Sequence, residues 1–377
     1  SLVCLVFWLF PVSWHIMSGS TDRPDPQIDD EDEESDEDTA VFKPFSQRPE
    51  WADVEGIPQD DGPFNVVKIA YSDQYTQTMN CFRAVMQSGE KSQRALALTA
   101  EVVNLNPANY VGWWYRRHCL AALGSDLTAE LAWMRPTLLG CTKNYQMWFH
   151  RRELVGRQEA PNIEDEKAII DEALKEDAKN YHSWCYRRWL VQHFQAYAGE
   201  LEWCTRLLTN DLRNNSAWNY RYFLVETRHT HGLSDAEKFE VLKHELRFTC
   251  EPLKITPNNE SPYNYVFGLC SLLSDPSYLL RYIQMAVQFL IATGTANPTC
   301  THTRATLILF LERLAEQCRD LTGVSDAELV AWAGSQVDNY KACLQTCKEL
   351  QKMDAIRKKY WFYQQQRFTA KIQEVQA

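Results

Sequence analysis

The 377-residue sequence contains no Gly-rich phosphate loop and no Gly-x-Ser-x-Gly segment. These absences argue against the common nucleotide-binding loops and against a serine hydrolase built on an α/β sheet. No stretch alternates apolar and polar residues in the way that a β-strand with one buried face does. The sequence therefore shows no self-sufficient active site, and its periodicity indicates a helical protein.

Metal-ligand spacing is missing as well. The twelve cysteines include no Cys-x-x-Cys pair, and only Cys343 and Cys347 lie within one helical turn of each other. His229-x-His231 is an isolated pair without a third ligand nearby in the sequence. Zinc sites need a closer grouping of Cys and His. We therefore expect no metal site in this chain, and reduced, mostly buried thiols in a cytoplasmic protein.

The chain also lacks a surplus of positive charge. Its formal net charge is −11, and residues 29–38 contribute nine acidic side chains to it. Removing those nine raises the net charge from −11 to −2, so the remaining body is nearly neutral. Such a body cannot neutralise a phosphate backbone, which excludes nucleic-acid binding as the main role. The acidic run itself is predicted to be a disordered, solvated tail.

Long apolar runs are equally scarce. Residues 1–16 are apolar and aromatic, but they lack a basic leader and a small-residue cleavage site, and they are too short to span a bilayer. We interpret them as a product of upstream translation or an added expression sequence, with an ordinary start at Met17. A signal anchor is the alternative, and N-terminal sequencing of the native protein separates the two. We expect no stable insertion into a membrane.

What the sequence does contain is a repeated motif: an Asn, a Trp four residues later and an Arg seven residues later. We call it the Asn-Trp-Arg motif, and its four copies are Asn109–Trp113–Arg116, Asn144–Trp148–Arg151, Asn180–Trp184–Arg187 and Asn214–Trp218–Arg221. A second Arg follows the first in three copies, and a fifth, worn copy begins at Asn259 with Tyr263 in the Trp position. The intervals between the four Trp residues are 35, 36 and 34 residues. A period of this length in a helical sequence is typical of stacked helical hairpins.

Helical geometry places the three motif residues on one face. Asn is a favoured N-cap, so each motif is predicted to open the second helix of a hairpin. The Trp is expected to wedge between hairpins, and the first Arg to hydrogen-bond carbonyls or a carboxylate of the preceding helix. Packing is the plain interpretation of residues that recur in this way. Function is expected where the copies differ.

The copies differ mainly around the Asn. The second residue after it is, in order, Val111, Gln146, His182, Ser216 and Ser261. The residue before it is a cation in three copies, at Lys143, Lys179 and Arg213. A cation there would join the positive end of the helix dipole and the free N–H groups to make an anion site. Spacing alone leaves all three cations open, and leaves open that each is an ordinary solvated surface charge.

These observations predict an all-α solenoid of tetratricopeptide-like helical hairpins, with helical periodicity from about Tyr71. The expected divisions are a disordered acidic segment over 1–43, an extended segment over 44–72 and a helical-repeat domain over 73–377. First helices of the hairpins are expected at 96–103, 127–139, 168–174, 201–208 and 239–248. Two further helical pairs are expected around 276–322 and 326–369.

The motifs and both flanks resemble a known family. The four Asn-Trp-Arg motifs are joined by Arg48-Pro-Glu-Trp51-Ala-Asp, by Gln59-Asp-Asp-Gly-Pro63 with Ile69-Ala-Tyr-Ser72, and by Asp354-x-Ile-Arg357-x-x-Tyr-Trp361. Together they cover about 45–363 and resemble the alpha subunit of the protein prenyltransferases. The similarity is greatest to the subunit shared by protein farnesyltransferase and type I protein geranylgeranyltransferase. The alpha subunit of the Rab-type enzyme shares the repeats, whereas the N-terminal segment and Gln146 favour the former class.

The resemblance implies a crescent-shaped right-handed superhelix wrapped around a beta subunit. It implies that the beta subunit holds a zinc ion and most of the isoprenoid pocket, that magnesium accompanies the diphosphate, and that the pair transfers a farnesyl or geranylgeranyl group from an isoprenyl diphosphate to the cysteine of a C-terminal Cys-a-a-X (CaaX) sequence. This agrees with the absence of a metal-ligand pattern from the sequence.

The resemblance also implies roles for particular residues. Lys143 matches the family lysine that contacts the diphosphate leaving group, and Gln146 matches the residue that hydrogen-bonds the terminal carboxylate of the acceptor peptide. Tyr145, Tyr181 and His182 match residues that line the same mouth. The competing hypotheses are a Rab-type alpha subunit and a non-catalytic helical-repeat protein that binds peptides.

Overall fold

The computed structural model describes residues 42–377, except for 65, 68 and 320. The predicted disordered segment over 1–43, including the apolar stretch at 1–16, lies outside the described residues apart from Phe42 and Lys43. Within the described part all regular structure is helical, as predicted. No helix there is both long and apolar enough to cross a membrane.

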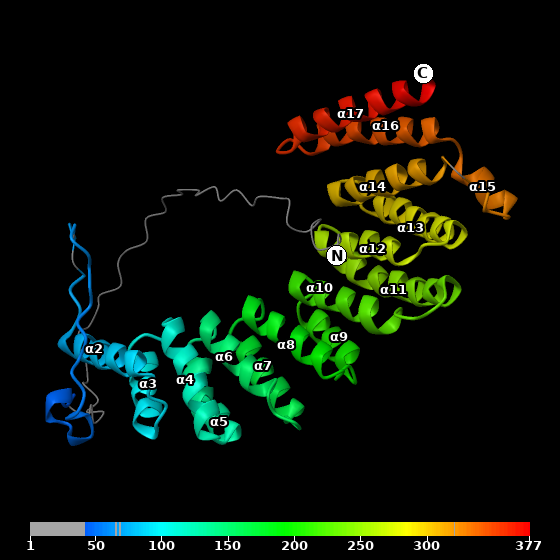
Figure 1. Cartoon of the computed structure of the whole chain (residues 1–377). Helices are drawn as coiled ribbons and strands as arrows, with labels where there is room; N and C mark the ends of the chain where they lie inside the picture. Colours follow the sequence, from blue (N-terminus) through cyan, green and yellow to red (C-terminus); the bar gives the residue numbers. More distant parts are fainter. Residues whose placement is uncertain (1–41, 65, 68, 320) are drawn as a thin grey trace, which may run out of the picture.

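The helices stack side by side into a curved array, with α2 (Asp73–Ser88) at one end and α17 (Lys358–Gln376) at the other (Figure 1). Two short 3-10 turns, Phe45–Gln47 and Pro49–Trp51, precede α2. The intervening helices are α3 (Gln93–Leu105), α4 (Tyr110–Leu123), α5 (Leu127–Gly140), α6 (Tyr145–Val155), α7 (Ile163–Glu176), α8 (Tyr181–His193), α9 (Glu200–Asn210), α10 (Asn215–Leu224), α11 (Asp235–Ile255), α12 (Glu260–Leu269), α13 (Pro276–Ala296), α14 (Thr301–Gln317), α15 (Ala327–Ala333) and α16 (Gln336–Met353).

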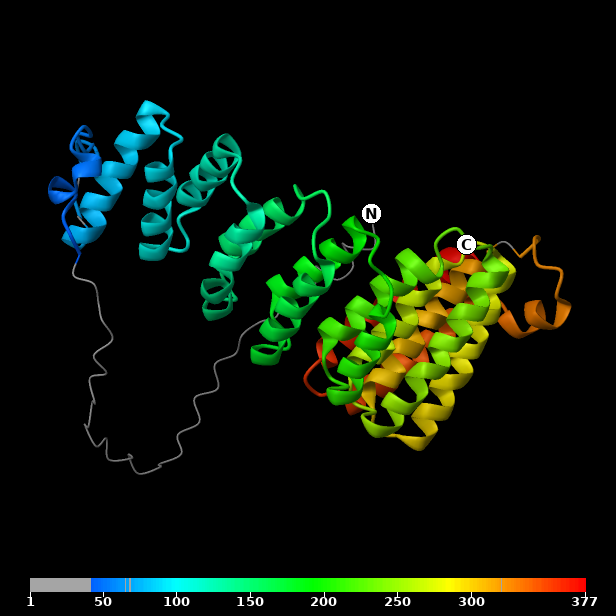
Figure 2. The ribbon, with the colours of Figure 1, turned by 90° about the horizontal axis from the view of Figure 1, so that it is seen from below.

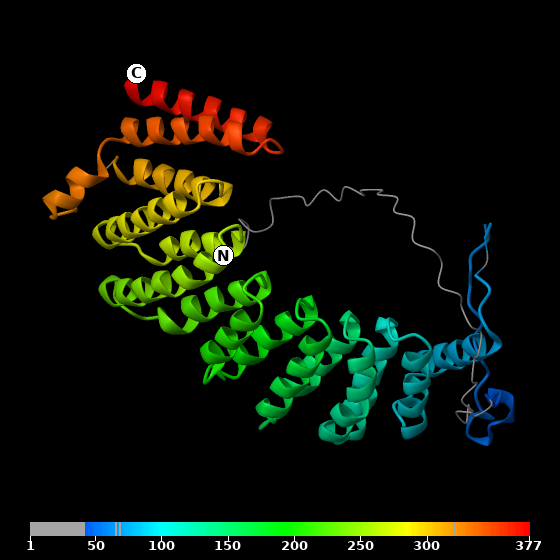
Figure 3. The ribbon, with the colours of Figure 1, turned by 180° about the vertical axis from the view of Figure 1, so that it is seen from behind.

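The expected first helices of the hairpins are confirmed as α3, α5, α7, α9 and α11, and the motif helices as α4, α6, α8, α10 and α12. The motif helices lie on the inner, concave side of the curve, and the first helices lie outside (Figures 1 and 3). Seen from below, successive hairpins are displaced like steps, so the array winds as it curves (Figure 2). The motif helices therefore line the hollow of the crescent (Figure 1).

Each motif Asn is the N-cap of its helix, as predicted. The side-chain oxygen accepts backbone N–H bonds of the first turn in all five copies, at Asn109, Asn144, Asn180, Asn214 and Asn259. These bonds satisfy donors that an uncapped helix would leave unpaired. The chain therefore enters every motif helix in the same way.

The motif Trp is fixed by a hydrogen bond to its own turn. Its indole N–H donates to the backbone carbonyl six residues earlier, for example from Trp148 to Thr142 at 2.7 Å and from Trp184 to Ala178 at 3.0 Å. The amide N–H of the next copy's Asn uses the same carbonyl, as Asn180 does on Thr142 at 3.2 Å. In the worn copy the hydroxyl of Tyr263 replaces the indole and donates to Pro257 at 2.9 Å. One carbonyl thus couples two adjacent hairpins.

The first Arg of each good motif binds a carboxylate on the following helix, which was not predicted. The predicted bonds to the preceding helix are present as well, to a carbonyl from Arg116 and Arg151 and to a carboxylate from Arg187. Arg151, for instance, makes two 2.7 Å hydrogen bonds to Glu166 of α7. Its bond to the preceding helix goes to a carbonyl, that of Leu131 at 3.2 Å. Only Arg187 also reaches an acid behind it, Asp171 at 2.8 Å. The arginine lies between two hairpins, and the first helix of the next hairpin supplies the carboxylate.

The same acid receives a third group from the next motif helix. Six residues after the motif Asn stands a Tyr or His whose polar atom meets the buried Glu. The four sets are Arg116–Glu130–His150, Arg151–Glu166–Tyr186, Arg187–Glu200–Tyr220 and Arg221–Glu245–Tyr265. We call them the buried ladder. Because every charge in it is paired and hydrogen-bonded, the ladder satisfies buried polar atoms and fixes the register of neighbouring hairpins.

Both flanks of the repeats are anchored by aromatic residues. Phe45 and Trp51 are buried against α2, α3 and α4, which agrees with the expectation that the N-terminal segment buries its rings on a surface. Farther along, Phe64 and Ile69 are 91 % and 70 % exposed. At the other flank, Asp354 accepts hydrogen bonds from Arg357 and from the indole of Trp361. The Asp354-x-Ile-Arg357-x-x-Tyr-Trp361 pattern therefore forms the turn between α16 and α17.

The predicted pair around 276–322 is present as α13 and α14, but the pair expected around 326–369 is wrong in its count. That region holds a short helix, α15, before the hairpin of α16 and α17. Ser335 caps α16 after Gly334, whose φ of 70° lies in the left-handed region, and this turn breaks the apolar pattern into two helices.

Candidate functional site

The residues predicted to carry function lie at the starts of two neighbouring motif helices on the concave side. Lys143, Tyr145 and Gln146 surround the start of α6, and Tyr181 and His182 open α8. The side chain of Lys143 is 79 % exposed, and Tyr145 and Tyr181 are 61 % and 68 % exposed. Large exposed aromatic rings at the starts of helices are unusual for residues whose role is packing, since the repeated Trp residues of the same helices are buried.

The structure brings the two groups together through their rings. The ring of His182 lies 6.0 Å from that of Tyr145 and 5.6 Å from that of Tyr181, edge-on to both. Partial burial lowers the pKa of His182, against a backbone hydrogen bond at Lys143 that favours the charged form. His182 therefore sits neutral between two tyrosines, as a bridge from α6 to α8.

Lys143 and Lys179 have matching surroundings. Lys143 lies 3.3 Å from Asp177, and Lys179 lies 3.8 Å from Asp211. Each aspartate stands three residues before the Asn of the next motif, so one interaction is simply repeated. The local geometry of the chain does not separate the two lysines.

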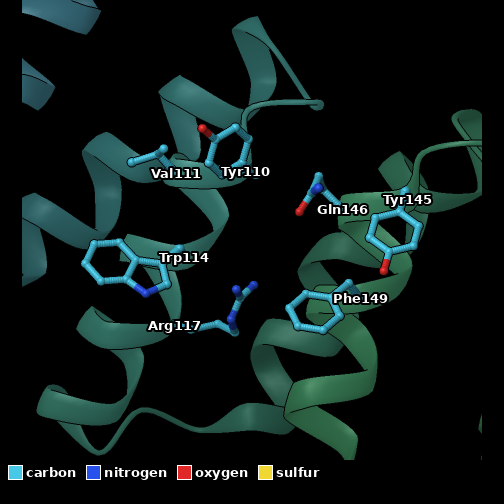
Figure 4. Close-up of a pocket in the computed structure, with 7 residues that line it drawn as sticks. All are labelled: Tyr110, Val111, Trp114, Arg117, Tyr145, Gln146 and Phe149. Carbon is cyan, nitrogen blue, oxygen red and sulfur yellow. The ribbon is translucent and has the colours of Figure 1, made fainter.

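A pocket of about 400 Å³ lies between α4 and α6 (Figure 4). Its lining residues are Tyr110, Val111, Trp114, Arg117, Tyr145, Gln146 and Phe149. Tyr145 and Gln146 were predicted as site residues, whereas the interest of Trp114, Arg117 and Phe149 was missed. Tyr181 and His182 do not line this pocket. A larger, shallower cleft of about 700 Å³ adjoins it and includes Lys143 and Asn144.

The sequence held one usable signal for Arg117. The residue six after the motif Asn is Tyr in every copy except the second, where it is His150. His150 is fully buried and its ring Nδ1 lies 3.4 Å from Nη1 of Arg117. A deviation in a residue that otherwise repeats marks the place where a shared packing role has changed.

Metal ligands do not gather at this site. In the part of the chain that the structure describes, no three His, Cys, Asp or Glu side chains are grouped so as to hold a metal ion. The described cysteines are free, and most of them are buried. The chemical groups that the candidate site offers are ammonium, amide and guanidinium donors and aromatic rings.

Comparisons with known proteins agree with this geometry. The model of the "Protein prenyltransferase alpha subunit repeat" family matches residues 92–123, 127–158, 163–194 and 197–228, which are the hairpins of the four good motifs. The protein farnesyltransferase/geranylgeranyltransferase type-1 subunit alpha of Solanum lycopersicum is 36% identical over 84% of this chain and 89% of its own length. Its counterpart in Dictyostelium discoideum is 40% identical over 62% of this chain and 73% of its own length.

The Rab-type comparison is weaker. The human geranylgeranyl transferase type-2 subunit alpha is 28% identical over 60% of this chain and 42% of its own length. Among solved structures, Candida albicans protein geranylgeranyltransferase-I complexed with GGPP has the same fold, with a TM-score of 0.66 and 24% identity over 87% of this chain and 99% of that chain.

The fold and the site thus identify a solenoid of α-α hairpins whose candidate functional residues lie at the starts of the motif helices on its concave side. Within that class, the chain belongs to the protein prenyltransferase alpha-subunit family, with the farnesyltransferase/geranylgeranyltransferase type-1 members.

Proposed function

We propose that this chain is the alpha half of a heterodimeric protein prenyltransferase. In this proposal a beta subunit lies in the hollow of the crescent, and the pair transfers a farnesyl or geranylgeranyl group to the cysteine of a C-terminal CaaX sequence. The observation that carries the proposal is the similarity to type-1 alpha subunits along almost their whole length, 89% in the tomato relative. A cytoplasmic location goes with it, supported by the free thiols.

The transfer forms a bond between the acceptor sulfur and C1 of the isoprenoid and breaks the bond from C1 to the diphosphate oxygen, and the diphosphate leaves with the bonding electrons. The described residues of this chain do not fit a zinc site. Zinc therefore belongs to the partner in this proposal, and magnesium would accompany the diphosphate. A thiol bound to zinc is deprotonated and nucleophilic at neutral pH.

Lys143 is proposed to assist departure of the diphosphate. Its ammonium is exposed, and Lys143 directly precedes Asn144, the N-cap of α6, so the charge lies near the positive end of the helix dipole. Negative charge grows on the leaving oxygen in the transition state, so a fixed cation there stabilises the transition state more than the bound substrate. Asp177, 3.3 Å away, holds the lysine near this position in the free chain.

Gln146 is proposed to bind the terminal carboxylate of the acceptor peptide through its side-chain amide. Asn144 accepts the backbone N–H of Gln146 at 2.9 Å, which fixes the start of the helix and leaves the amide facing the pocket (Figure 4). Tyr145, Tyr181 and His182 would line the mouth through which the peptide reaches that amide. None of these residues needs to change protonation during the transfer.

The decisive experiment is reconstitution. The chain is co-expressed with a farnesyltransferase beta subunit or a type I geranylgeranyltransferase beta subunit, and each purified complex is assayed with both isoprenyl diphosphates on CaaX peptides. Peptides with Ser in place of the acceptor Cys are the control. We expect a stable zinc-containing heterodimer that modifies the peptide without an escort protein. A monomer that binds peptides alone would indicate a binding-only repeat protein, and double prenylation that depends on an escort protein would indicate the Rab-type enzyme.

A further inference from the structure

Arg117 is a buried guanidinium that faces an open pocket. Its residue is 8 % exposed, yet the pocket between α4 and α6 opens onto it. Figure 4 shows the guanidinium between Trp114 of α4 and Phe149 of α6, with Gln146 apart from it nearer the start of its helix. The ring of Phe149 lies 5.1 Å from the guanidinium carbon. The other residues that line the pocket are largely aromatic, so the guanidinium is surrounded mainly by rings.

No carboxylate pairs with Arg117 within the described residues. Glu153, whose charge raises the pKa of Arg117, forms a 3.7 Å ion pair with Arg157 instead. The first Arg of every good motif, by contrast, holds a buried Glu with two hydrogen bonds, as Arg116 does with Glu130. Burial without a partner lowers the pKa of Arg117. A buried cation without a counter-ion lowers the stability of the folded chain. Its presence here therefore suggests a role other than folding, such as binding an anionic group.

The equivalent arginines of the next two copies behave differently. Arg152 and Arg188 are exposed, and they lie over the rings of Trp189 and Phe223 at 5.1 and 4.5 Å. Neither lines the 400 Å³ pocket or the cleft beside it. The second Arg of the motif is therefore an ordinary surface residue in those copies, and its burial in the first copy is a specific feature of one seam.

His150 explains how that seam holds the guanidinium. Its Nε2 lies 3.1 Å from Glu130, so Nε2–H donates to the carboxylate, and Nδ1 is left to accept from Arg117 at 3.4 Å. A Tyr at this position would also donate to Glu130, as Tyr186 donates to Glu166 at 2.7 Å. A tyrosine would not offer the arginine a ring nitrogen. The exchange of Tyr for His thus adds an acceptor whose effect is to aim Arg117.

We propose that Arg117, positioned by His150, is the point at which the concave face receives a carboxylate side chain of the partner subunit. The inference rests on the proposed function, because it needs a partner in the hollow. A planar guanidinium binds a carboxylate through two parallel hydrogen bonds, and arginine among aromatic rings is the usual composition of an interface hot spot.

The acceptor peptide's own carboxylate is the less suitable occupant. Gln146 is the second residue of α6, whereas Arg117 is the eighth of α4. Six residues along parallel motif helices amount to about 9 Å, which is more than one carboxylate spans. If Gln146 binds the peptide terminus, the carboxylate at Arg117 must come from another group. The partner subunit can supply it in every heterodimer, whether or not a peptide is bound.

The test measures assembly separately from catalysis. We expect Arg117→Gln to weaken the affinity between the purified subunits about 30-fold or more, the lower range for removing one partner of a buried charge pair. His150→Tyr, which copies the other repeats and keeps the bond to Glu130, is expected to weaken it by a smaller factor. Arg152→Gln and Arg188→Gln are the matched controls and should leave the affinity unchanged.

The free chain supplies a readout that a purely structural arginine would not give. Because Arg117 is an unpaired buried cation, Arg117→Gln should leave the urea midpoint of the isolated chain unchanged or raised. A lowered midpoint with unaltered subunit affinity would overturn the proposal. So would unaltered affinity with a raised peptide KM, which is the behaviour expected of Gln146→Ala and would make the peptide the occupant. Failure to find any beta partner would refute the proposed function instead, whereas normal assembly and transfer by Arg117→Gln would refute this inference alone.

Discussion

At the scale of single residues, the candidate site is composed of small departures from a repeated pattern. Lys143 and Lys179 occupy equivalent positions and each faces an aspartate of the next turn. If Lys143 alone assists the leaving group, as proposed, the difference between the two lysines comes from what lies opposite them in the assembled enzyme. Position 150 differs from the lysine positions because its change is visible within the chain itself. A buried histidine stands there in place of the tyrosine of the other copies.

The two lysines make a matched pair for testing the proposed role of Lys143. Lys143→Ala is expected to slow the chemical step of the reconstituted heterodimer about 10-fold or more, because a cation at a developing oxyanion acts in the transition state. Substrate binding should change less. Lys179→Ala removes an equivalent surface ion pair and should change little. Single-turnover rates at saturating substrate provide the measurement, and equal effects of the two substitutions would contradict the assignment.

His150 is expected to make the free chain sensitive to mild acid. Burial lowers the pKa of His150 below its ordinary value of 6.5, although the hydrogen bond to Glu130 opposes this, and Arg117 and Arg116 lower it further. The unfolded chain therefore binds a proton that the folded chain does not, so stability falls as the pH drops below about 6.5. The loss cannot exceed about 1.4 kcal/mol per pH unit for one proton.

The measurement is urea unfolding of the wild-type chain and of His150→Tyr between pH 7.5 and pH 5, values chosen to bracket about 6.5, the ordinary histidine pKa. Tyrosine does not titrate in this range, so the variant should have a flatter profile. The Glu130 carboxylate is present in both chains. Burial disfavours its ionisation, but hydrogen bonds from His150 and Arg116 outweigh burial and lower its pKa. Its own stabilisation is lost only at lower pH, and parallel profiles for the two chains would show that His150 is not the sensitive group.

At the scale of helices and hairpins, the motif Asn has two roles that the sequence shows only in part. Its N-cap role follows from residue type and position, and it was predicted. Its second role, a bond from the amide N–H to a carbonyl of the previous hairpin, depends on how hairpins stack. Asn180 makes this bond to Thr142 at 3.2 Å and is only 2 % exposed.

Asn180→Ala should therefore cost more than an ordinary cap. We expect a loss of about 2 kcal/mol in the free energy of unfolding, with about half from the cap and half from the bond between hairpins. Asn162, which caps α7 on an exposed turn, is the control. Asn162→Ala loses a cap and an exposed hydrogen bond to Asp165 of the same helix, but no bond between hairpins, and should cost about 1 kcal/mol. Urea unfolding compares the two, and equal losses would mean that the bond between hairpins adds nothing.

At the scale of the whole molecule, the chain is a curved array of helices with its candidate functional residues on the concave side. Motif helices line the hollow, and the N-terminal segment leaves Phe64 and Ile69 exposed. Such an arrangement fits a subunit whose site is completed by another chain. The described residues hold no group of three His, Cys, Asp or Glu that could bind a metal ion. The proposed function accordingly divides the enzyme into a scaffold, which is this chain, and a partner that holds the zinc.

Chelation tests this division. A strong zinc chelator should abolish transfer by the heterodimer while leaving the urea unfolding of the isolated alpha chain unchanged, since metal binding stabilises only the chain that holds the ligands. Added zinc should restore transfer. A shift in the unfolding of the isolated chain on chelation would show that this subunit itself holds a metal.

The sequence by itself determined the helical class, the period near 35 residues, the N-caps and the positions of the candidate residues at the starts of motif helices. These follow from residue type and spacing along one helix, which are local properties. It also located Gln146 and His182 as departures from the repeat.

Only the tertiary structure decided which groups meet across hairpins. The Glu that binds the first Arg lies 14, 15, 13 and 24 residues after it in the four copies. Turn lengths vary between hairpins, so no constant spacing marks the acid, and the pairing appears once the helices are stacked. Arg117 was hidden for the same reason: one arginine among several similar ones becomes a buried, unpaired cation through the neighbours that packing gives it.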